Sequence, residues 1–398
     1  MIKKSFTRIL IAISFAFPTV LFRILSIHPD PIIMTIVFGA GIVVAAVMLS
    51  WAAEAAQIDI SASFAVAILA LIAVLPEYAV DLYFAFTAGS KPEFTHYAAA
   101  NMTGSNRLLI GIGWPVVVFT FVLARRLKKQ KVSQVILEPK AKVELAFLGI
   151  ACIYSLIIPF LKKIALFDSF VLIFLFFLYM FKVSSQEQKD PDLIGVPAGL
   201  KSLTKIQRFI TVNSMFLIAG GLVYMSAQPF ADSLLEMGRI FKINEFLLVQ
   251  WIAPSATEAP ELIVAVIYAY RNKSSQAMGT LLSSKINQWT LLVGSLPVAY
   301  MIGGGGLSLP LDIRQNEEFV LTAAQSILGF AFIMNLKLSL RDSIILLSLF
   351  LIQFLFVGTN VRIILSVLYV IIALFIIIIQ RKKILPISKS FISSTGRN

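Results

Sequence analysis

The sequence predicts an all-α integral membrane protein of about twelve transmembrane helices, with a ten-helix core made of two inverted five-helix repeats. Of its 398 residues, 58% are hydrophobic and only 14% are charged, which is far from the composition of a soluble domain. Apolar stretches of about twenty residues, long enough to cross the hydrocarbon core of a bilayer, recur along almost the whole chain. A pair of short motifs also occurs twice in opposite orientation, as described below.

The apolar stretches define the predicted spans in order. The first is preceded by Lys3 and Lys4 and superficially resembles a secretory signal peptide, but it lacks a small-residue cleavage pattern, so we expect a retained helix. The single cysteine, Cys152, lies within an apolar stretch, which argues against a disulfide framework or a thiolate metal cluster. The predicted spans are 6–27, 32–53, 60–88, 97–124, 144–161, 166–183, 208–227, 241–270, 276–302, 317–336, 342–358 and 361–380.

Basic residues concentrate in alternate connections, after the fourth, sixth, eighth, tenth and twelfth spans. By the positive-inside rule these connections face the cytoplasm, so we expect both termini there and the protein in the cell (inner) membrane. The net charge of +13 therefore indicates topology rather than nucleic-acid binding, because the basic residues do not form a soluble face with interleaved aromatic residues. The clusters include Arg125, Arg126, Lys128, Lys129, Lys131, Lys201, Lys205, Arg208, Arg271, Lys273, Lys337, Arg341, Arg381, Lys382 and Lys383.

The predicted organisation has five parts. Residues 1–31 form an extra N-terminal helix, 32–183 the first five-helix repeat, and 184–207 a cytoplasmic linker. Residues 208–358 form the second repeat, and 359–398 an extra C-terminal helix with a basic tail. The linker is predicted because it is the longest and most polar connection and contains two prolines and two glycines.

A short motif recurs in the third and eighth predicted spans. Residues 75–77 read Leu-Pro-Glu and residues 259–261 read Ala-Pro-Glu, and each is followed by a second matching segment, at 100–109 and 279–288. The two copies are five membrane crossings apart, so they enter the membrane from opposite sides, as in the inverted repeats of many secondary transporters. The repeated helix pairs cover about 68–115 and 249–297.

In these residues the chain resembles the calcium/cation antiporter superfamily, which includes sodium/calcium exchangers. The two alpha repeats of that family usually read Ser-Leu-Pro-Glu and then Gly-Asn-x-x-Gly-Ser-Asn-x-x-Asn. The resemblance covers both repeats and the ten-helix arrangement from about residue 32 to 358. It implies a secondary active cation antiporter of the sodium/calcium exchanger type, which binds its ion near the midplane between the repeats and exposes it alternately to each side. The transported cations would be Na⁺, Ca²⁺ or H⁺, and no cofactor is expected.

Four acidic side chains in the repeats need a reason to lie at membrane depth, where a carboxylate is costly. Glu77 and Asp81 are four residues apart and Glu258 and Glu261 are three apart, so each pair shares one helix face. A cation between the two faces would meet four carboxylates, with Glu77 and Glu261, the glutamates of the family motif, as its metal ligands. Neutral oxygen ligands are predicted at Asn101, Ser105, Thr257, Ser283, Ser284 and Gln288.

The two prolines of the repeats could add backbone ligands. Pro76 and Pro260 each remove an intrahelical hydrogen bond and free a carbonyl one turn earlier, at Ile72 and Ala256. Alternatively, the prolines only kink their helices and the acids close internal salt bridges. Asp81 and Glu258, which do not directly follow a proline, could instead line a water-filled access path.

Several positions depart from the family pattern. Ala73 and Val74 replace its Thr-Ser pair, Glu258 takes a serine position, and Lys285 takes the asparagine of Gly-Ser-Asn. The Lys285 ammonium could act as a built-in substitute cation, which would lower the number of ions bound and favour proton coupling, because neighbours can shift the pKa of a buried Lys or Glu. Alternatively, Lys285 and Arg107 face away from the site in structural ion pairs.

Three classes of function are compared: an antiporter, a membrane-embedded enzyme and a channel. Exchange of calcium for sodium and exchange of a monovalent cation for protons are both open on this fold. A membrane-embedded enzyme is not predicted, because the sequence has no His-Glu-x-x-His, Gly-x-Ser-x-Gly or intramembrane aspartyl-protease pattern. A channel would use the same polar residues without countertransport. The expected partners are inorganic cations and the lipid bilayer, with no nucleic acid.

Overall fold

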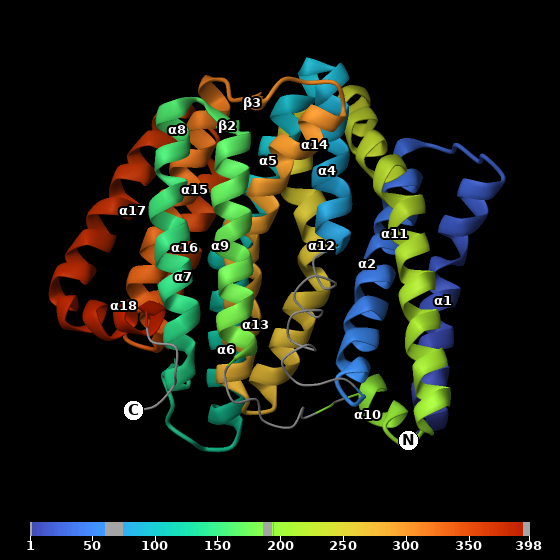
Figure 1. The fold of residues 1–398 in the computed structure, drawn as a ribbon, viewed down its shortest axis with the longest axis horizontal. Helices are drawn as coiled ribbons and strands as arrows, with labels where there is room; N and C mark the ends of the chain where they lie inside the picture. The colour runs from blue at the N-terminus through green and yellow to red at the C-terminus, as the bar shows by residue number, and fades with distance from the viewer. Residues whose placement is uncertain (1, 60–74, 186–192, 194, 393–398) are drawn as a thin grey trace. The chain divides into compact units, whose positions relative to one another are not determined.

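The computed structural model describes residues 2–59, 75–185, 193 and 195–392, and helices dominate this part of the chain (Figure 1). Eight helical stretches within it are long and apolar enough to cross a membrane. The predicted spans 276–302, 317–336 and 342–358 are also helical but are not among these eight. Part of the predicted span 60–88 lies outside the described residues, so the total of about twelve stays a prediction.

The chain divides into two compact units, and the division falls inside the two helices that carry the Pro-Glu motifs. The helix α4 (Leu75–Ser90) is divided after Phe84, and α12 (Glu245–Tyr270) directly before Glu261. Residues of both repeat segments are therefore found in each unit. Unit 1 comprises Met1–Phe84 and Val183–Pro260, and unit 2 comprises Ala85–Lys182 and Glu261–Asn398.

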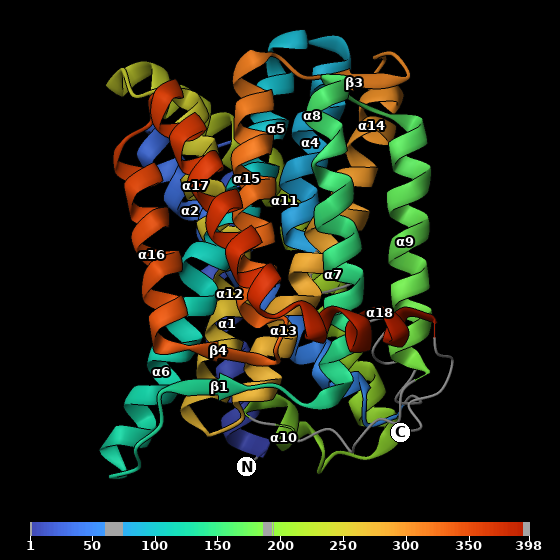
Figure 2. The same cartoon turned by 90° about the vertical axis from the view of Figure 1, so that its left-hand side faces the viewer.

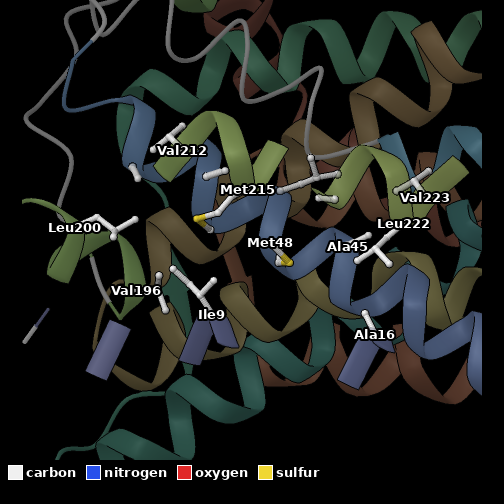
Figure 3. Close-up of a cluster of buried hydrophobic side chains, with 14 residues drawn as sticks. Ile9, Ala16, Ala45, Met48, Val196, Leu200, Val212, Met215, Leu222 and Val223 are labelled. Atoms are coloured by element: carbon white, nitrogen blue, oxygen red, sulfur yellow. The ribbon is translucent and has the colours of Figure 1, made fainter. Parts of the chain in front are cut away.

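Unit 1 is a bundle in which α2 packs along α11 and α1 (Figure 1). Apolar side chains from these helices and from α10 form its core, including Met48, Met215 and Leu222 (Figure 3). α2 starts sharply because the Asp30 carboxylate accepts a hydrogen bond from the Ile32 amide and a proline follows it. The helices of this unit, besides parts of α4 and α12, are α1 (Ile2–Ile24), α2 (Pro31–Ala56), α10 (Val196–Leu200) and α11 (Lys205–Phe241).

The close approach of α2 to its neighbours depends on Gly41. A Cβ added there would lie 2.6 Å from Ser226 Oγ of α11 and 2.7 Å from Thr19 Oγ1 of α1. We expect Gly41→Val to lower the stability of the protein by about 1–3 kcal/mol, because backbone and side chains must move apart to admit the new methyl groups. Thermal unfolding in detergent would measure the loss. The matched control is Gly220→Ala in α11, where no atom lies within 4 Å, and a similar loss there would contradict the packing argument.

An ion pair closes the end of unit 1 at which α2 finishes and α11 begins. The Arg208 guanidinium donates two hydrogen bonds of 2.6 Å to the Asp59 carboxylate, and its Nη1 donates to the Leu203 carbonyl at 2.9 Å. These bonds hold the pKa of Asp59 below its usual value, chiefly through the hydrogen bond and secondarily through the positive charge. The turn after α2 is thereby tied to the start of α11.

The lowered pKa of Asp59 makes its contribution to stability dependent on pH. A carboxyl with a lower pKa in the folded state stabilises the fold fully above its unfolded pKa of about 3.9, and this contribution is lost as the pH falls through the folded pKa. We therefore expect Asp59→Asn to lower the unfolding temperature at pH 7 and to flatten its decline below about pH 4. Equal declines in the variant and the wild type would contradict the assignment.

Unit 2 is built of helices joined by two short antiparallel ribbons. β1 (Gln134–Ile136) pairs with β4 (Lys337–Ser339) (Figure 2), and β2 (Lys163–Ala165) pairs with β3 (Ser308–Pro310) (Figure 1). Within this unit α15 packs against α17, α5 and α7, and α13 packs against α7. The helices of unit 2, besides the remaining parts of α4 and α12, are α5 (Thr95–Leu108), α6 (Trp114–Leu127), α7 (Lys142–Ser155), α8 (Ile157–Leu161), α9 (Leu166–Ser184), α13 (Ser274–Asn287), α14 (Val293–Ile302), α15 (Ile313–Ile333), α16 (Leu340–Leu355), α17 (Thr359–Ile379) and α18 (Ile384–Ile392).

Two π-helical turns interrupt the long helices of unit 2. η2 (Leu109–Gly113) lies between α5 and α6, and η4 (Gln288–Leu292) lies between α13 and α14. Each begins at the last residue of the second matching segment of its repeat, Leu109 or Gln288. A π-turn widens the helix by one residue and is frequently found at functional sites. Short 3₁₀ turns occur at Pro92–Phe94 (η1), Pro139–Ala141 (η3) and Arg381–Lys383 (η5).

Candidate ion-binding site

Unit 1 carries three of the four predicted acids. Glu77 and Asp81 lie on α4, and Glu258 lies on α12 next to Thr257, and all four side chains are buried. The Thr257 hydroxyl donates to the carbonyls of the preceding turn. Charged groups are rarely buried unless they are paired or bind a cation, so this concentration is typical of an ion path.

The two prolines of the motifs lie on α4 and α12. Pro76 lies near the start of the described part of α4, and Ile72, Ala73 and Val74 lie outside the described residues. Pro260 lies inside α12, which continues through it to Tyr270. It therefore leaves the Ala256 carbonyl without the usual intrahelical donor.

Unit 2 carries Glu261 and most of the neutral oxygen groups. The Glu261 carboxylate interacts with the Ser284 hydroxyl of α13. Asn101 and Ser105 lie one turn apart on α5 and are fully buried. Among the described residues, neither the Asn101 amide nor the Ser105 hydroxyl has a hydrogen-bond partner. Such orphaned buried oxygens are costly and are the groups that a bound cation would satisfy.

Two further predicted ligands lie on the other repeat segment of unit 2. Ser284 and Gln288 are one turn apart on α13 and η4, and both are buried. Ser283 turns to another neighbour, since its hydroxyl accepts a 3.0 Å hydrogen bond from Tyr179 of α9. That bond was not predicted and has no signal in the motifs.

Lys285 is completely buried, and its ammonium points at α5. Its Nζ donates to the Asn106 backbone carbonyl at 2.8 Å and to the Asn106 side-chain oxygen at 2.7 Å. It also lies 5.3 Å from the centre of the Trp289 ring, within range of a cation–π interaction. Asn106 belongs to the Gly-Ser-Asn motif of the first repeat, so the lysine of one repeat is bonded to the asparagine of the other.

Arg107 takes part in a buried ion pair. Its Nη2 lies 2.7 Å from Glu318 Oε2 of α15, and both side chains are at most 3% exposed. The Gln325 amide donates to the Arg107 carbonyl at 3.1 Å. The motifs gave no indication of Glu318, although a glutamate inside an otherwise apolar predicted span is itself a sign of a buried partner.

The predicted four-carboxylate cluster stays a prediction, because its members are divided between the units, with Glu77, Asp81 and Glu258 in unit 1 and Glu261 in unit 2. Over the described ranges, no group of three or more His, Cys, Asp or Glu side chains is brought together closely enough to hold a metal ion.

The chain matches a family model and several solved structures. The model of the sodium/calcium exchanger protein family matches residues 31–184 and 212–359. The crystal structure of the H⁺/Ca²⁺ exchanger CAX is similar to this chain with a TM-score of 0.94 and 42% identity, covering 99% of each chain. No curated protein sequence matches the chain.

Two more distant structures share the fold alone. The Ca²⁺/H⁺ antiporter protein YfkE has a TM-score of 0.62 and 16% identity, covering 91% of this chain and 99% of its own. The sodium-calcium exchanger NCX_Mj has a TM-score of 0.53 and 17% identity, covering 82% of this chain and 97% of its own. The family match shows that the chain belongs to the sodium/calcium exchanger family, and with the likeness to CAX and the apolar helices it makes the protein a multi-pass membrane antiporter of cations.

Proposed function

We propose that the protein exchanges Ca²⁺ for H⁺ across the cell membrane. The observation that carries the proposal is the buried ammonium of Lys285, which takes the place of a neutral asparagine in the family motif and is held by Asn106. A fixed positive charge repels additional cations, so a site that contains it accommodates fewer ions than a set of neutral ligands would. Protons on the carboxylates can then be exchanged for one Ca²⁺. The 42% identity to a structure described as an H⁺/Ca²⁺ exchanger supports this choice.

Oxygen ligands from both repeat segments would bind the calcium ion. Glu77 and Glu261 supply carboxylates, which are also the groups that would take up protons when calcium leaves. Asp81 and Glu258 would be further ligands or would line the path to the site. Calcium prefers six to eight oxygen ligands, so neutral groups are needed as well. These would be Asn101, Ser105, Thr257, Ser284 and Gln288.

The inverted five-helix repeats, at 32–183 and 208–358, are supported by the ribbons of unit 2. β1 and β3 follow the third helix of their repeats, α6 and α14, and β2 and β4 follow the fourth, α8 and α15. By position in the repeats, β1 corresponds to β3 and β4 corresponds to β2. The β1–β4 ribbon therefore corresponds to the β2–β3 ribbon. The π-turns η2 and η4 correspond in the same way. A two-fold relation of this kind underlies alternating access in many secondary transporters.

We further propose that both termini are cytoplasmic. The β1–β4 ribbon brings the basic loop after α6 to the same end of unit 2 as Lys337 and Arg341. Ser275, in the first turn of α13 directly after the connection that contains Arg271 and Lys273, also accepts a hydrogen bond from the Glu138 amide there. Three basic connections thus share one end of the unit, in agreement with the positive-inside rule.

Calcium flux in proteoliposomes tests the proposed exchange. We expect an acidic lumen to drive ⁴⁵Ca²⁺ uptake into vesicles, because protons leave as calcium enters. Uptake driven by a sodium gradient alone would instead make the protein a sodium/calcium exchanger. Flux of Na⁺ or K⁺ against protons without calcium transport would favour a monovalent cation/proton antiporter. Absence of flux under all three gradients would overturn the proposal.

A further inference from the structure

A buried chain of charged residues connects α17 to α5 within unit 2. Arg107 of α5 pairs with Glu318 of α15 at 2.7 Å, and Arg362 Nη1 of α17 lies 3.8 Å from the other oxygen of Glu318. Arg362 also donates from Nε and Nη2 to Glu317, at 3.0 and 2.7 Å. Two adjacent glutamates of α15 therefore lie between an arginine of the first repeat and one of the C-terminal helix.

Arg362 is also held by groups at and just before the start of α17. Its Nη2 donates to the Thr359 hydroxyl at 2.9 Å and its Nη1 donates to the Val357 carbonyl. Arg314, near the start of α15, interacts electrostatically with both glutamates and with Arg362. The positive charges around Glu318 in the described part of the chain include Arg107, Arg314 and Arg362, and removing one of them alters the balance that holds the others.

The same chain reaches the candidate ion site through one peptide bond. Arg107 directly follows Asn106, whose two oxygens hold the Lys285 ammonium. The Arg107 guanidinium is fixed by Glu318, its carbonyl by Gln325, and its Nε donates to the Thr103 carbonyl at 3.3 Å. Any displacement of Arg107 therefore moves Asn106, and with it the Lys285 ammonium that Asn106 holds next to Ser284.

We infer that Arg362 is a positioning residue for calcium binding, which acts through Glu318 and Arg107 to hold Asn106 and Lys285 in place. This inference rests on the ligand set proposed above. It assigns a role in ion binding to the C-terminal helix α17, which follows the two repeats and carries none of the proposed ligands. Loss of an outer partner that orients binding residues typically weakens metal affinity by about 10- to 100-fold.

The test compares equilibrium ⁴⁵Ca²⁺ binding to the full-length protein in detergent with exchange rates in proteoliposomes. We expect Arg362→Gln to weaken calcium binding and raise KM about tenfold while the maximal rate changes less, because the ligands remain present but less well ordered. Arg362→Lys, which keeps a positive charge near Glu318, should recover part of the affinity.

Glu317→Gln is the matched control. It weakens the bond that ties Arg362 to α15 but leaves the Arg362–Glu318–Arg107 chain intact, so we expect wild-type calcium affinity even if the unfolding temperature falls. Wild-type affinity in folded Arg362→Gln would overturn the inference, as would an equal loss in Glu317→Gln. If Arg362→Gln does not fold, Glu318→Asp tests the same link, because the shorter side chain lengthens the contact with Arg107. Weaker calcium binding in this variant would support the inference, and wild-type affinity would overturn it.

These measurements separate the inference from the proposed function. If the wild type binds calcium but exchanges it for sodium, the proposed coupling fails while the binding comparison between variants still decides the inference. A wild type that binds no calcium would overturn both the proposed ligand set and the inference that rests on it.

Discussion

Replacing Glu261 with glutamine is expected to abolish calcium exchange, with a loss of at least about 100-fold in uptake rate. Glutamine keeps the shape and one oxygen of the side chain but removes both the negative charge that would bind calcium and the oxygen that would accept a proton. The Glu261 side chain is half-buried and interacts with the Ser284 hydroxyl, so its replacement by the similarly shaped glutamine should not unfold the protein. Uptake of ⁴⁵Ca²⁺ by proteoliposomes under a pH gradient measures the effect.

The same helix supplies the control. Glu245 lies at the start of α12 and pairs with Arg239 near the surface, so Glu245→Gln should leave uptake close to the wild-type rate. If Glu261→Gln retained uptake while remaining folded, the ion site would have to lie elsewhere in the chain. Loss of uptake in Glu245→Gln as well would indicate a general defect rather than a missing ligand.

Replacing Lys285 with asparagine is expected to change which ion is coupled to calcium. The substitution restores the neutral residue of the family motif and removes the ammonium that donates to Asn106. Without the fixed charge, additional cations are no longer repelled, so Na⁺ should compete with Ca²⁺ and proton-driven uptake should fall by at least about tenfold. Inhibition of ⁴⁵Ca²⁺ uptake by external Na⁺ measures this change.

Lys285→Arg provides the comparison, because it keeps the charge but cannot reproduce the geometry of a compact ammonium. We expect it to transport poorly and yet to show no inhibition by sodium. Sodium insensitivity in Lys285→Asn, together with wild-type proton-driven uptake, would contradict the role assigned to the charge. Unfolding temperatures of both variants separate this effect from a loss of packing around Trp289.

The membrane class and the family could be predicted from the sequence, because they depend on composition and on local motifs. The Leu-Pro-Glu and Ala-Pro-Glu motifs and their partner segments were sufficient to identify the antiporter family, which the family match confirms. The contacts of Lys285 and Arg107 were left as alternatives, because a motif specifies residues along one helix and not the helix packed against it. Glu318 and Arg362 lie far along the chain from Arg107 and have no shared pattern with it.

The interruptions of the helices also could not be predicted from the sequence. The π-turns η2 and η4 share only leucine in their sequences, and no common residue type marks them. Likewise the strands β1 to β4 are three residues each, too short for an alternating pattern to be recognised. Such features are decided by tertiary contacts between segments that are distant along the chain.

The two ribbons of unit 2 have a consequence for how such a protein could arise from a single repeat. Each ribbon joins a strand of one proposed repeat to a strand of the other, and neither repeat pairs its own two strands. A polypeptide with only one repeat would leave every strand edge unsatisfied, and it would complete them only by joining a second copy inserted in the opposite direction. The ancestor of the present chain would then be an antiparallel homodimer, and joining its two copies in one gene would fix their opposite orientations.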